Sequence, residues 1–227
     1  MASKPILYGT YTSPGVNAVI ITFKLLKVDF DFCLVRPMEG ESGMPEYLKK
    51  NPTGTIPALK TEDQRFLGDS HAITAYIVDR YGNARDDDGS LYPRDLYKRA
   101  KVQQLQHFAD SILFATCVKP AFAPIFSRLS NTVSEEILKN FDKAYAMMER
   151  FLVEHKWLAA DHMTIADINC ITCMYGLYYL QPFTQETHPL LHDWFQRIMQ
   201  ISEVYDTLMG NSVATSLNFL NKNVSKL

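Results

Sequence analysis

The chain has only four cysteines among its 227 residues, too few for a small scaffold held together by disulfide bonds. Two of them, Cys170 and Cys173, form a C-x-x-C pair inside a strongly helical run, whereas a redox pair opens a helix after a strand. We therefore expect reduced, buried thiols there. No second C-x-x-C completes a zinc site, and His188 and His192 lack further ligands nearby in the sequence, so we expect no metal.

The chain also lacks an excess of basic residues and a long apolar run. Its formal net charge is −2, which generates no overall field to recruit nucleic acid. No apolar stretch reaches the roughly 20 residues that span a bilayer. The N-terminal "MASKPILYG" offers one lysine and a short apolar run, less than the core of a signal peptide. We therefore expect a cytoplasmic protein without a nucleic-acid or membrane partner.

The apolar content is sufficient to bury a core, since 47% of the residues are hydrophobic and 21% are charged. The length suits one large domain or two small ones. The composition changes at residues 83–93, "NARDDDGSLYP", where three consecutive aspartates, a glycine and a proline indicate a solvated linker. The sequence therefore predicts a first domain over residues 1–82 and a second over residues 94–227.

Strand and helix patterns alternate in the first domain. Period-2 runs predict strands, and apolar residues at steps of three and four predict helices. The expected order is a strand at 5–10, a helix at 14–26, a strand at 29–35, a short helix at 45–51, two strands within 55–68 and a helix at 69–81. The last two strands are close enough for a hairpin, so we expect a small α/β domain with a mixed sheet.

The second domain shows helical patterns only. Leu105, Phe108 and Ile112 recur on one helical face, and further helices follow. In "HMTIADINC", Thr164 is an expected N-cap, and Asp167 lies three residues later, as in a capping box. We therefore expect an all-α helical domain.

The stretch "YTSPGVNAV", residues 11–19, places Ser13 between the first strand and the first helix. Backbone N–H groups at a helix start are unpaired and carry roughly half a positive charge, so an anion is stabilised there. A serine at this position can also simply cap the helix. The residue by itself leaves both interpretations open.

Two further stretches favour a ligand site. In "TIP", the Ile56–Pro57 bond is a candidate for the cis form, and the Ile56 backbone could pair with an extended peptide. In "DSHAI", Asp69 and Ser70 offer a carboxylate and a hydroxyl at the start of another helix, for an ammonium and a carboxylate respectively. With Ser13, these residues outline a site for a small zwitterionic peptide whose thiol lies near the first helix.

Six motifs in order and spacing resemble the cytosolic glutathione S-transferases: "SPGVNAV", "GE…PEYLKKNP", "TIPAL", "DSHAI..YIVDRYG", "SLYP" and "MTIADINC". The chain is most similar to the insect delta and epsilon classes. The resemblance implies a thioredoxin-like N-terminal domain, an all-α helical C-terminal domain and a homodimer. It also implies a detoxification-type enzyme of xenobiotic metabolism that conjugates glutathione, its co-substrate, to small hydrophobic electrophiles.

The resemblance also implies roles for individual residues. Ser13 would be the catalytic residue, donating its hydroxyl to the glutathione sulfur. A thiol pKa near 8.5 falls by about one unit or more beside a donor at a helix N-terminus, which supplies more thiolate. The residues implied to bind glutathione are Ser13, Ser42, Thr55, Ile56, Pro57, Asp69, Ser70 and His71.

The chain departs from the class pattern at three positions. Ser42 and Gly54 stand where histidines are usual, and Asn17 stands where arginine is frequent. Losing the two histidines removes contacts to the glycyl carboxylate that are worth about 1.5–3 kcal/mol each when charged. We therefore expect weaker glutathione binding than the class pattern implies.

The acceptor substrate would contact an apolar stretch of the second domain, although core packing is the alternative for each of its residues. By resemblance the acceptor residues are Phe114, Cys117, Val118, Ala121, Phe122, Ile125, Phe126, Leu217 and Phe219. Pro120 and Pro124 lie inside this stretch and predict a kink or break in its helix.

Three functions compete at this point. The first is the transferase, and the alternative is a binding protein of the same fold that sequesters hydrophobic ligands with little turnover. A thiol-disulfide oxidoreductase ranks last, because it needs a cysteine where Ser13 stands.

Overall fold

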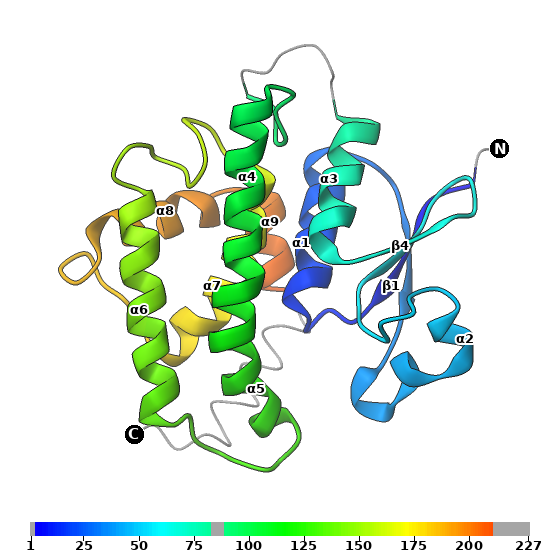
Figure 1. The fold of residues 1–227 in the computed structure, drawn as a ribbon, viewed down its shortest axis with the longest axis horizontal. Helices are drawn as coiled ribbons and strands as arrows, with labels where there is room; N and C mark the ends of the chain where they lie inside the picture. The colour runs from blue at the N-terminus through cyan, green and yellow to red at the C-terminus, as the bar shows by residue number, and fades with distance from the viewer. Residues whose placement is uncertain (1–2, 83–88, 211–227) are drawn as a thin grey trace. The chain divides into compact units, whose positions relative to one another are not determined.

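A computed structural model of the chain describes residues 3–82 and 89–210. The chain divides into two compact units, Met1–Ala84 and Arg85–Leu227 (Figure 1). The first carries a small mixed sheet with helices and the second is helical in its described residues, so the expected fold class is confirmed.

The first unit is built on a four-stranded sheet in the order β2-β1-β3-β4. β1 pairs with β2 in parallel and with β3 in antiparallel fashion, and β3 pairs with β4 in antiparallel fashion, so the expected mixed sheet is confirmed. The elements are β1 (Ile6–Gly9), α1 (Pro14–Leu25), β2 (Asp31–Leu34), the 3₁₀ turns η1 (Pro37–Glu39) and η2 (Glu41–Gly43), α2 (Pro45–Leu48), β3 (Ala58–Lys60), β4 (Phe66–Gly68) and α3 (Ser70–Tyr81).

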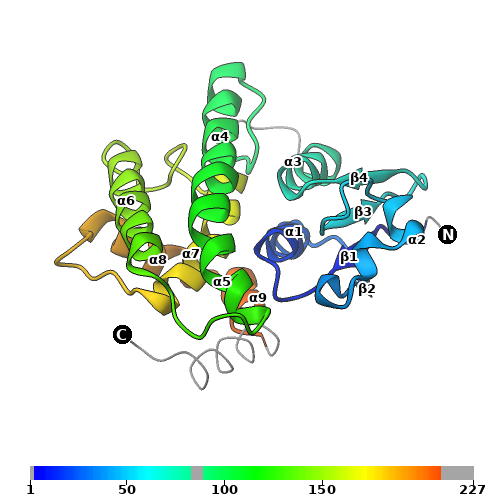
Figure 2. The ribbon, with the colours of Figure 1, turned by 60° about the horizontal axis from the view of Figure 1, so that its bottom comes forward.

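The two faces of this sheet carry separate apolar clusters, because side chains alternate along a strand. Leu7 and Leu59 pack with residues of α1 and α3, whereas Ala58 on the opposite face packs with Tyr47 of α2. Figure 2 shows α1 and α3 together on one side of the strands and α2 on the other. This packing brings the starts of α1 and α3 to the same part of the unit.

The second unit consists of α4 (Leu96–Phe108), the π-helical segment η3 (Ala109–Val118), α5 (Lys119–Phe126), α6 (Glu135–Phe151), α7 (Ile165–Leu180), α8 (Pro189–Met199) and α9 (Ser202–Leu208). By length and composition alone, the continuous helix Leu96–Phe126 is the one among the described residues that could cross a membrane. Its inward side packs on α6 and α7, so we assign it to the core of the unit.

The sequence predicts a kink or break near Pro120 and Pro124, and the helix runs through Pro120 without a break and ends at Phe126, two residues after Pro124. In η3 the helix widens, so that the Lys119 N–H donates to the Phe114 carbonyl, five residues back. α5 continues this helix from Lys119, so Pro120 lies inside a continuous helix, where its missing N–H costs one helical hydrogen bond at the end of the widened segment. Pro124 lies in the helix interior, and the helix ends soon after it at Phe126.

A buried carboxylate organises the start of α7. Asp167 accepts hydrogen bonds from the Thr164 N–H at 2.8 Å, the Leu158 N–H at 2.9 Å and the Trp194 indole N–H at 2.9 Å. The expected contact from Asp167 back to the N-cap is therefore confirmed. The same side chain also ties α7 to α8 through Trp194.

Candidate functional site

Ser13 ends the loop between β1 and α1 and is the N-cap of α1. Its Oγ accepts a hydrogen bond from the Val16 N–H at 3.4 Å, and its own N–H donates to the Thr10 carbonyl at 3.1 Å. The capping interpretation is therefore confirmed, but the two roles do not exclude each other. A hydroxyl accepts and donates at once, and the Ser13 hydroxyl donates to no acceptor within residues 3–82 and 89–210, so its proton can bind an anion. The side chain is half-buried.

The Ile56–Pro57 peptide bond is cis, as the sequence suggested. The Ile56 N–H and C=O have no hydrogen-bond partner within residues 3–82 and 89–210, because β3 begins only at Ala58. Just before it, the Thr55 carbonyl accepts from the Tyr47 hydroxyl and from Asn51 Nδ2, each at 2.8 Å. An anchored carbonyl followed by an unpaired peptide unit can receive one residue of an extended peptide.

Asp69 is the N-cap of α3 and has a positive φ of 69°. Its Oδ1 accepts from the His71 N–H at 2.9 Å and from the Ala72 N–H at 3.0 Å. Its Oδ2 has no hydrogen-bond partner in the part of the chain that the structure describes. One oxygen therefore caps the helix, and the other can accept from an ammonium group. Ser70 is the first residue of α3.

Gly15 shows that these segments meet. A Cβ built on Gly15, in the first turn of α1, would lie 3.0 Å from Ser70 Oγ and 3.3 Å from Pro57 Cδ. Three segments far apart in the sequence therefore converge: the start of α1, the cis-proline turn and the start of α3. The structure thus brings together the elements that carry Ser13, Ile56 and Ser70.

Ser42 and Gly54, where the class pattern has histidines, are neighbours. Gly54 has a positive φ of 65°, and a Cβ built there would lie 3.3 Å from the Ser42 carbonyl oxygen. Ser42 is buried in η2. Neither residue supplies a cation, so these two positions do not themselves replace the missing imidazoles. His71, in the first turn of α3, is half-buried.

The Thr55 hydroxyl belongs to a closed ring of hydrogen bonds. Asn51 Nδ2 lies 3.3 Å from Thr55 Oγ1, the Thr55 and Thr53 hydroxyl oxygens are 2.7 Å apart, and Thr53 Oγ1 donates to Asn51 Oδ1 at 2.9 Å. If the Thr55 hydroxyl donates to Thr53, every proton in the ring is used. Thr55 therefore positions the Ile56 peptide unit through its anchored carbonyl, and it offers no free hydroxyl.

The expected acceptor residues of the second unit lie on η3 and α5, and most are buried. Phe114 and Phe126 keep 36% and 37% of their surface exposed. The buried members are Cys117, Val118, Ala121, Phe122 and Ile125. Burial raises the pKa of the Cys117 thiol. Phe114 and Phe126 are thus the members best exposed to a ligand, and Leu217 and Phe219 lie outside the described residues.

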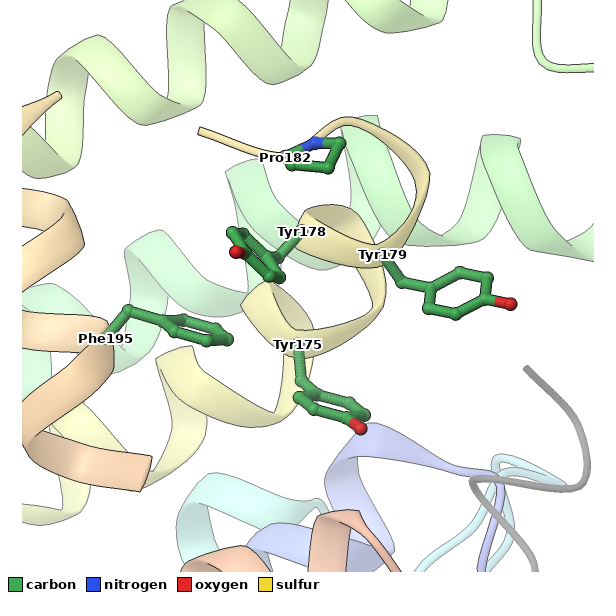
Figure 3. A pocket seen from close by; sticks show the side chains of 5 residues that line it. All are labelled: Tyr175, Tyr178, Tyr179, Pro182 and Phe195. Atoms are coloured by element: carbon green, nitrogen blue, oxygen red, sulfur yellow. The ribbon is translucent and has the colours of Figure 1, made fainter. Parts of the chain in front are cut away.

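Figure 3 shows a pocket of about 250 Å³ in the second unit that sequence reasoning missed. Its lining residues are Tyr175, Tyr178 and Tyr179 of α7, Pro182, and Phe195 of α8. The Tyr175 hydroxyl donates to Met209 Sδ at 2.7 Å. The helical spacing of the three tyrosines can be read from the sequence, but the pocket forms only where α7 packs on α8.

The C-x-x-C thiols are buried and free, as expected. Burial raises the pKa of Cys173 to about 12 and that of Cys170 well above its ordinary value, so neither thiol ionises readily. Within residues 3–82 and 89–210, no group of three or more His, Cys, Asp or Glu side chains gathers to hold a metal ion.

Comparison with known proteins gives consistent matches to one family. The family model described as "Glutathione S-transferase, N-terminal domain" matches residues 7–85, and the model described as "Glutathione S-transferase, C-terminal domain" matches residues 111–201. Glutathione S-transferase 1 of Manduca sexta is 35% identical over 201 residues, 88% of this chain and 89% of that protein.

Solved structures agree with these matches. An epsilon-class glutathione S-transferase from the housefly, Musca domestica, has a TM-score of 0.90 at 33% identity, covering 99% of this chain and 100% of that one. A glutathione transferase homolog from Drosophila mojavensis, solved with bound glutathione, has a TM-score of 0.88 at 32% identity and covers 99% of each chain.

Proposed function

This chain belongs to the glutathione S-transferase family, and we propose that Ser13 is its catalytic residue. It is a glutathione transferase with relatives among the insect delta and epsilon classes. The observation that carries the proposal is the geometry of Ser13, whose oxygen accepts from the Val16 N–H while its proton stays free to donate.

Glutathione would bind along the surface where the three segments of the first unit converge. The cysteinyl residue of glutathione pairs with the Ile56 backbone, which lacks any other partner among the described residues. The γ-glutamyl ammonium binds Asp69 Oδ2, and its carboxylate binds Ser70 at the start of α3, where the helix dipole favours an anion. Four further residues complete the proposed glutathione-binding set: Ser42, Thr55, Pro57 and His71.

The thiol of bound glutathione then lies near the start of α1. The Ser13 hydroxyl and the helix end favour the thiolate and lower the thiol pKa from about 8.5 by one unit or more. The thiol proton leaves to solvent. The thiolate forms a carbon–sulfur bond with a small hydrophobic electrophile, and the bond to the leaving group breaks with its electron pair on that group. This is conjugation of the detoxification type, in which the residues of η3 and α5 contact the electrophile.

We further propose that the protein is a cytoplasmic homodimer, as is typical of the family, without a nucleic-acid or membrane partner and without a metal. The proposed domain boundaries are residues 1–82 for glutathione binding, 83–93 for the linker and 94–227 for the acceptor site. The alternative, a binding protein with little turnover, is not favoured. The relatives that match most of this chain, over most of their own length, are named as transferases.

The decisive experiment compares Ser13→Ala with Ser134→Ala. Ser134 caps α6 with the same geometry, accepting from the Ile137 N–H at 3.4 Å, so it controls for the loss of a serine cap. Turnover of a chromogenic aryl halide with glutathione is measured over about pH 5.5–9. We expect Ser13→Ala to lose about 100-fold in kcat/KM at neutral pH and to raise the apparent pKa of the bound thiol. Ser134→Ala should keep the wild-type kcat/KM and the wild-type apparent pKa of the bound thiol. An unchanged rate and pH profile in Ser13→Ala would refute the assigned role.

A further inference from the structure

Asn17 contacts the loop that carries Ser13. It lies in the second turn of α1 with 3% of its surface exposed, and its Nδ2 donates to the Tyr11 carbonyl at 2.9 Å. Its backbone N–H donates to the Ser13 carbonyl at 3.0 Å. Asn17 therefore bonds both to Ser13, the N-cap of α1, and to Tyr11, two residues before the cap.

Two other contacts hold the loop over residues 10–13. Ser13 N–H donates to the Thr10 carbonyl, which closes a turn over residues 10–13, and the Tyr11 ring stacks on Phe32 with centroids 4.3 Å apart. Tyr11 and Thr12 are otherwise exposed. The orientation of the Tyr11–Thr12 peptide decides how the chain enters Ser13. The hydrogen bond from Asn17 Nδ2 to the Tyr11 carbonyl constrains this orientation.

The orientation of the Asn17 amide follows from its partner. A reversed amide would place Oδ1 against the Tyr11 carbonyl oxygen, and two acceptors cannot bond. With Nδ2 on Tyr11, Oδ1 is buried and has no hydrogen-bond partner among the described residues. A buried acceptor without a partner costs stability, and an apolar side chain of similar size would avoid this cost. The unpartnered Oδ1 therefore offsets the stability that the bond from Nδ2 to Tyr11 contributes, so an asparagine here gives little net gain in folding stability.

We propose that Asn17 is a positioning residue that fixes the turn over residues 10–13 and so aims the Ser13 hydroxyl at the glutathione sulfur. This inference rests on the proposed role of Ser13. Asn17 does not touch the reacting atoms: its amide acts on the Tyr11 carbonyl, and the turn acts on Ser13. Without the amide, the Ser13 hydroxyl samples several directions and stabilises the thiolate less well.

The test variant is Asn17→Leu, which removes the Tyr11 contact and the unpartnered oxygen while keeping the volume close. The matched control is Asn169→Leu, because Asn169 is also a buried helical asparagine, bonded to Gln106 Nε2 at 3.0 Å in the second unit. The measurements are the denaturation midpoint, the KM for glutathione, and kcat/KM for an aryl halide over the same pH range.

We expect Asn17→Leu to keep the wild-type denaturation midpoint or exceed it. Its kcat/KM at neutral pH should fall about tenfold, its pH profile should move to higher pH, and its KM for glutathione should stay within about a factor of two. Asn169→Leu should lower stability without moving the pH profile. Wild-type kcat/KM and pH profile in Asn17→Leu would overturn the proposal. Should this variant not fold, Asn17→Ala, which only removes atoms, takes its place.

A double-mutant comparison separates this inference from the role of Ser13. In a Ser13→Ala background, Asn17→Leu should change kcat/KM by less than about a factor of two, because the hydroxyl that it positions is gone. A further tenfold loss would overturn the positioning role and leave the role of Ser13 intact. If Ser13→Ala by itself leaves the rate and the thiol pKa unchanged, the proposed function fails, and the positioning role fails with it.

Discussion

Gly15 and Ser70 are in contact where α1 and α3 begin, and a Cβ on Gly15 would lie 3.0 Å from Ser70 Oγ and 3.1 Å from Ser70 Cβ. Contacts that short occur only if a neighbour moves. The absence of a side chain at residue 15 therefore sets how closely the two helix starts approach. In the proposed site, that distance separates the groups that bind the γ-glutamyl end of glutathione from Ser13.

Gly15→Ala should push Ser70 and Pro57 away from α1 and weaken glutathione binding. We expect the KM for glutathione to rise about tenfold. The free energy of unfolding should change little, because the better helix propensity of alanine offsets part of the steric cost. Gly43→Ala is the control, since a Cβ there meets nothing within 4 Å. Steady-state kinetics at varied glutathione concentration measure the effect. An unchanged KM in Gly15→Ala would show that the close approach is not required.

Tyr47→Phe removes the hydroxyl that donates to the Thr55 carbonyl at 2.8 Å. Asn51 still donates to that carbonyl, so the loss should be about 1 kcal/mol of unfolding free energy at mildly alkaline pH. Denaturant unfolding of both proteins measures it. A loss near zero would mean that Asn51 alone holds the Thr55 carbonyl.

The same pair of proteins should differ in their response to alkali. Burial raises the pKa of Tyr47 to about 12, above the value near 10 for an exposed tyrosine. Between about pH 10 and 12 the unfolded chain therefore loses this proton first, so Tyr47 stabilises the fold below about pH 10 and loses that contribution as the pH rises. The stability of Tyr47→Phe should decline less steeply over this range. Parallel pH dependences would argue against the raised pKa.

Asp167→Ala should be among the most damaging single changes in the second unit. It leaves the N–H groups of Leu158, Thr164 and Trp194 buried without their acceptor, which costs about 3–5 kcal/mol. Asp193→Ala, at an exposed aspartate of α8, should stay within about 0.5 kcal/mol of wild type. Thermal unfolding followed by circular dichroism compares the two. Equal midpoints would contradict the organising role of Asp167.

Ser42→His should restore a contact to the glycyl carboxylate. Imidazole is protonated below its ordinary pKa near 6.5, so the KM for glutathione should fall about tenfold near pH 6 and much less near pH 8. Ser42→Asn, a neutral polar side chain, controls for size. Because Ser42 is buried, the denaturation midpoint of each variant is measured as well. A folded histidine variant with the same KM at both pH values would place the glycyl end elsewhere.

The sequence predicted the order of elements, the mixed sheet, the Ser13 cap, the contact from Asp167 to Thr164 and the buried C-x-x-C thiols. Each of these follows mainly from interactions within a few residues: helical or strand periodicity, an unpaired N–H at a helix start, or a proline in a first turn. The order and spacing of the six motifs also indicated the family.

Tertiary structure alone decided the rest. The approach of Gly15 to Pro57 and Ser70, the adjacency of Ser42 and Gly54, and the pocket between α7 and α8 join segments that are distant in the chain. Even the local contact from Asn17 to Tyr11 depends on how the loop leaves β1. Local propensity acts along the backbone and specifies which elements form. The distances between side chains on different elements follow from how those elements pack, and packing is a property of the whole unit.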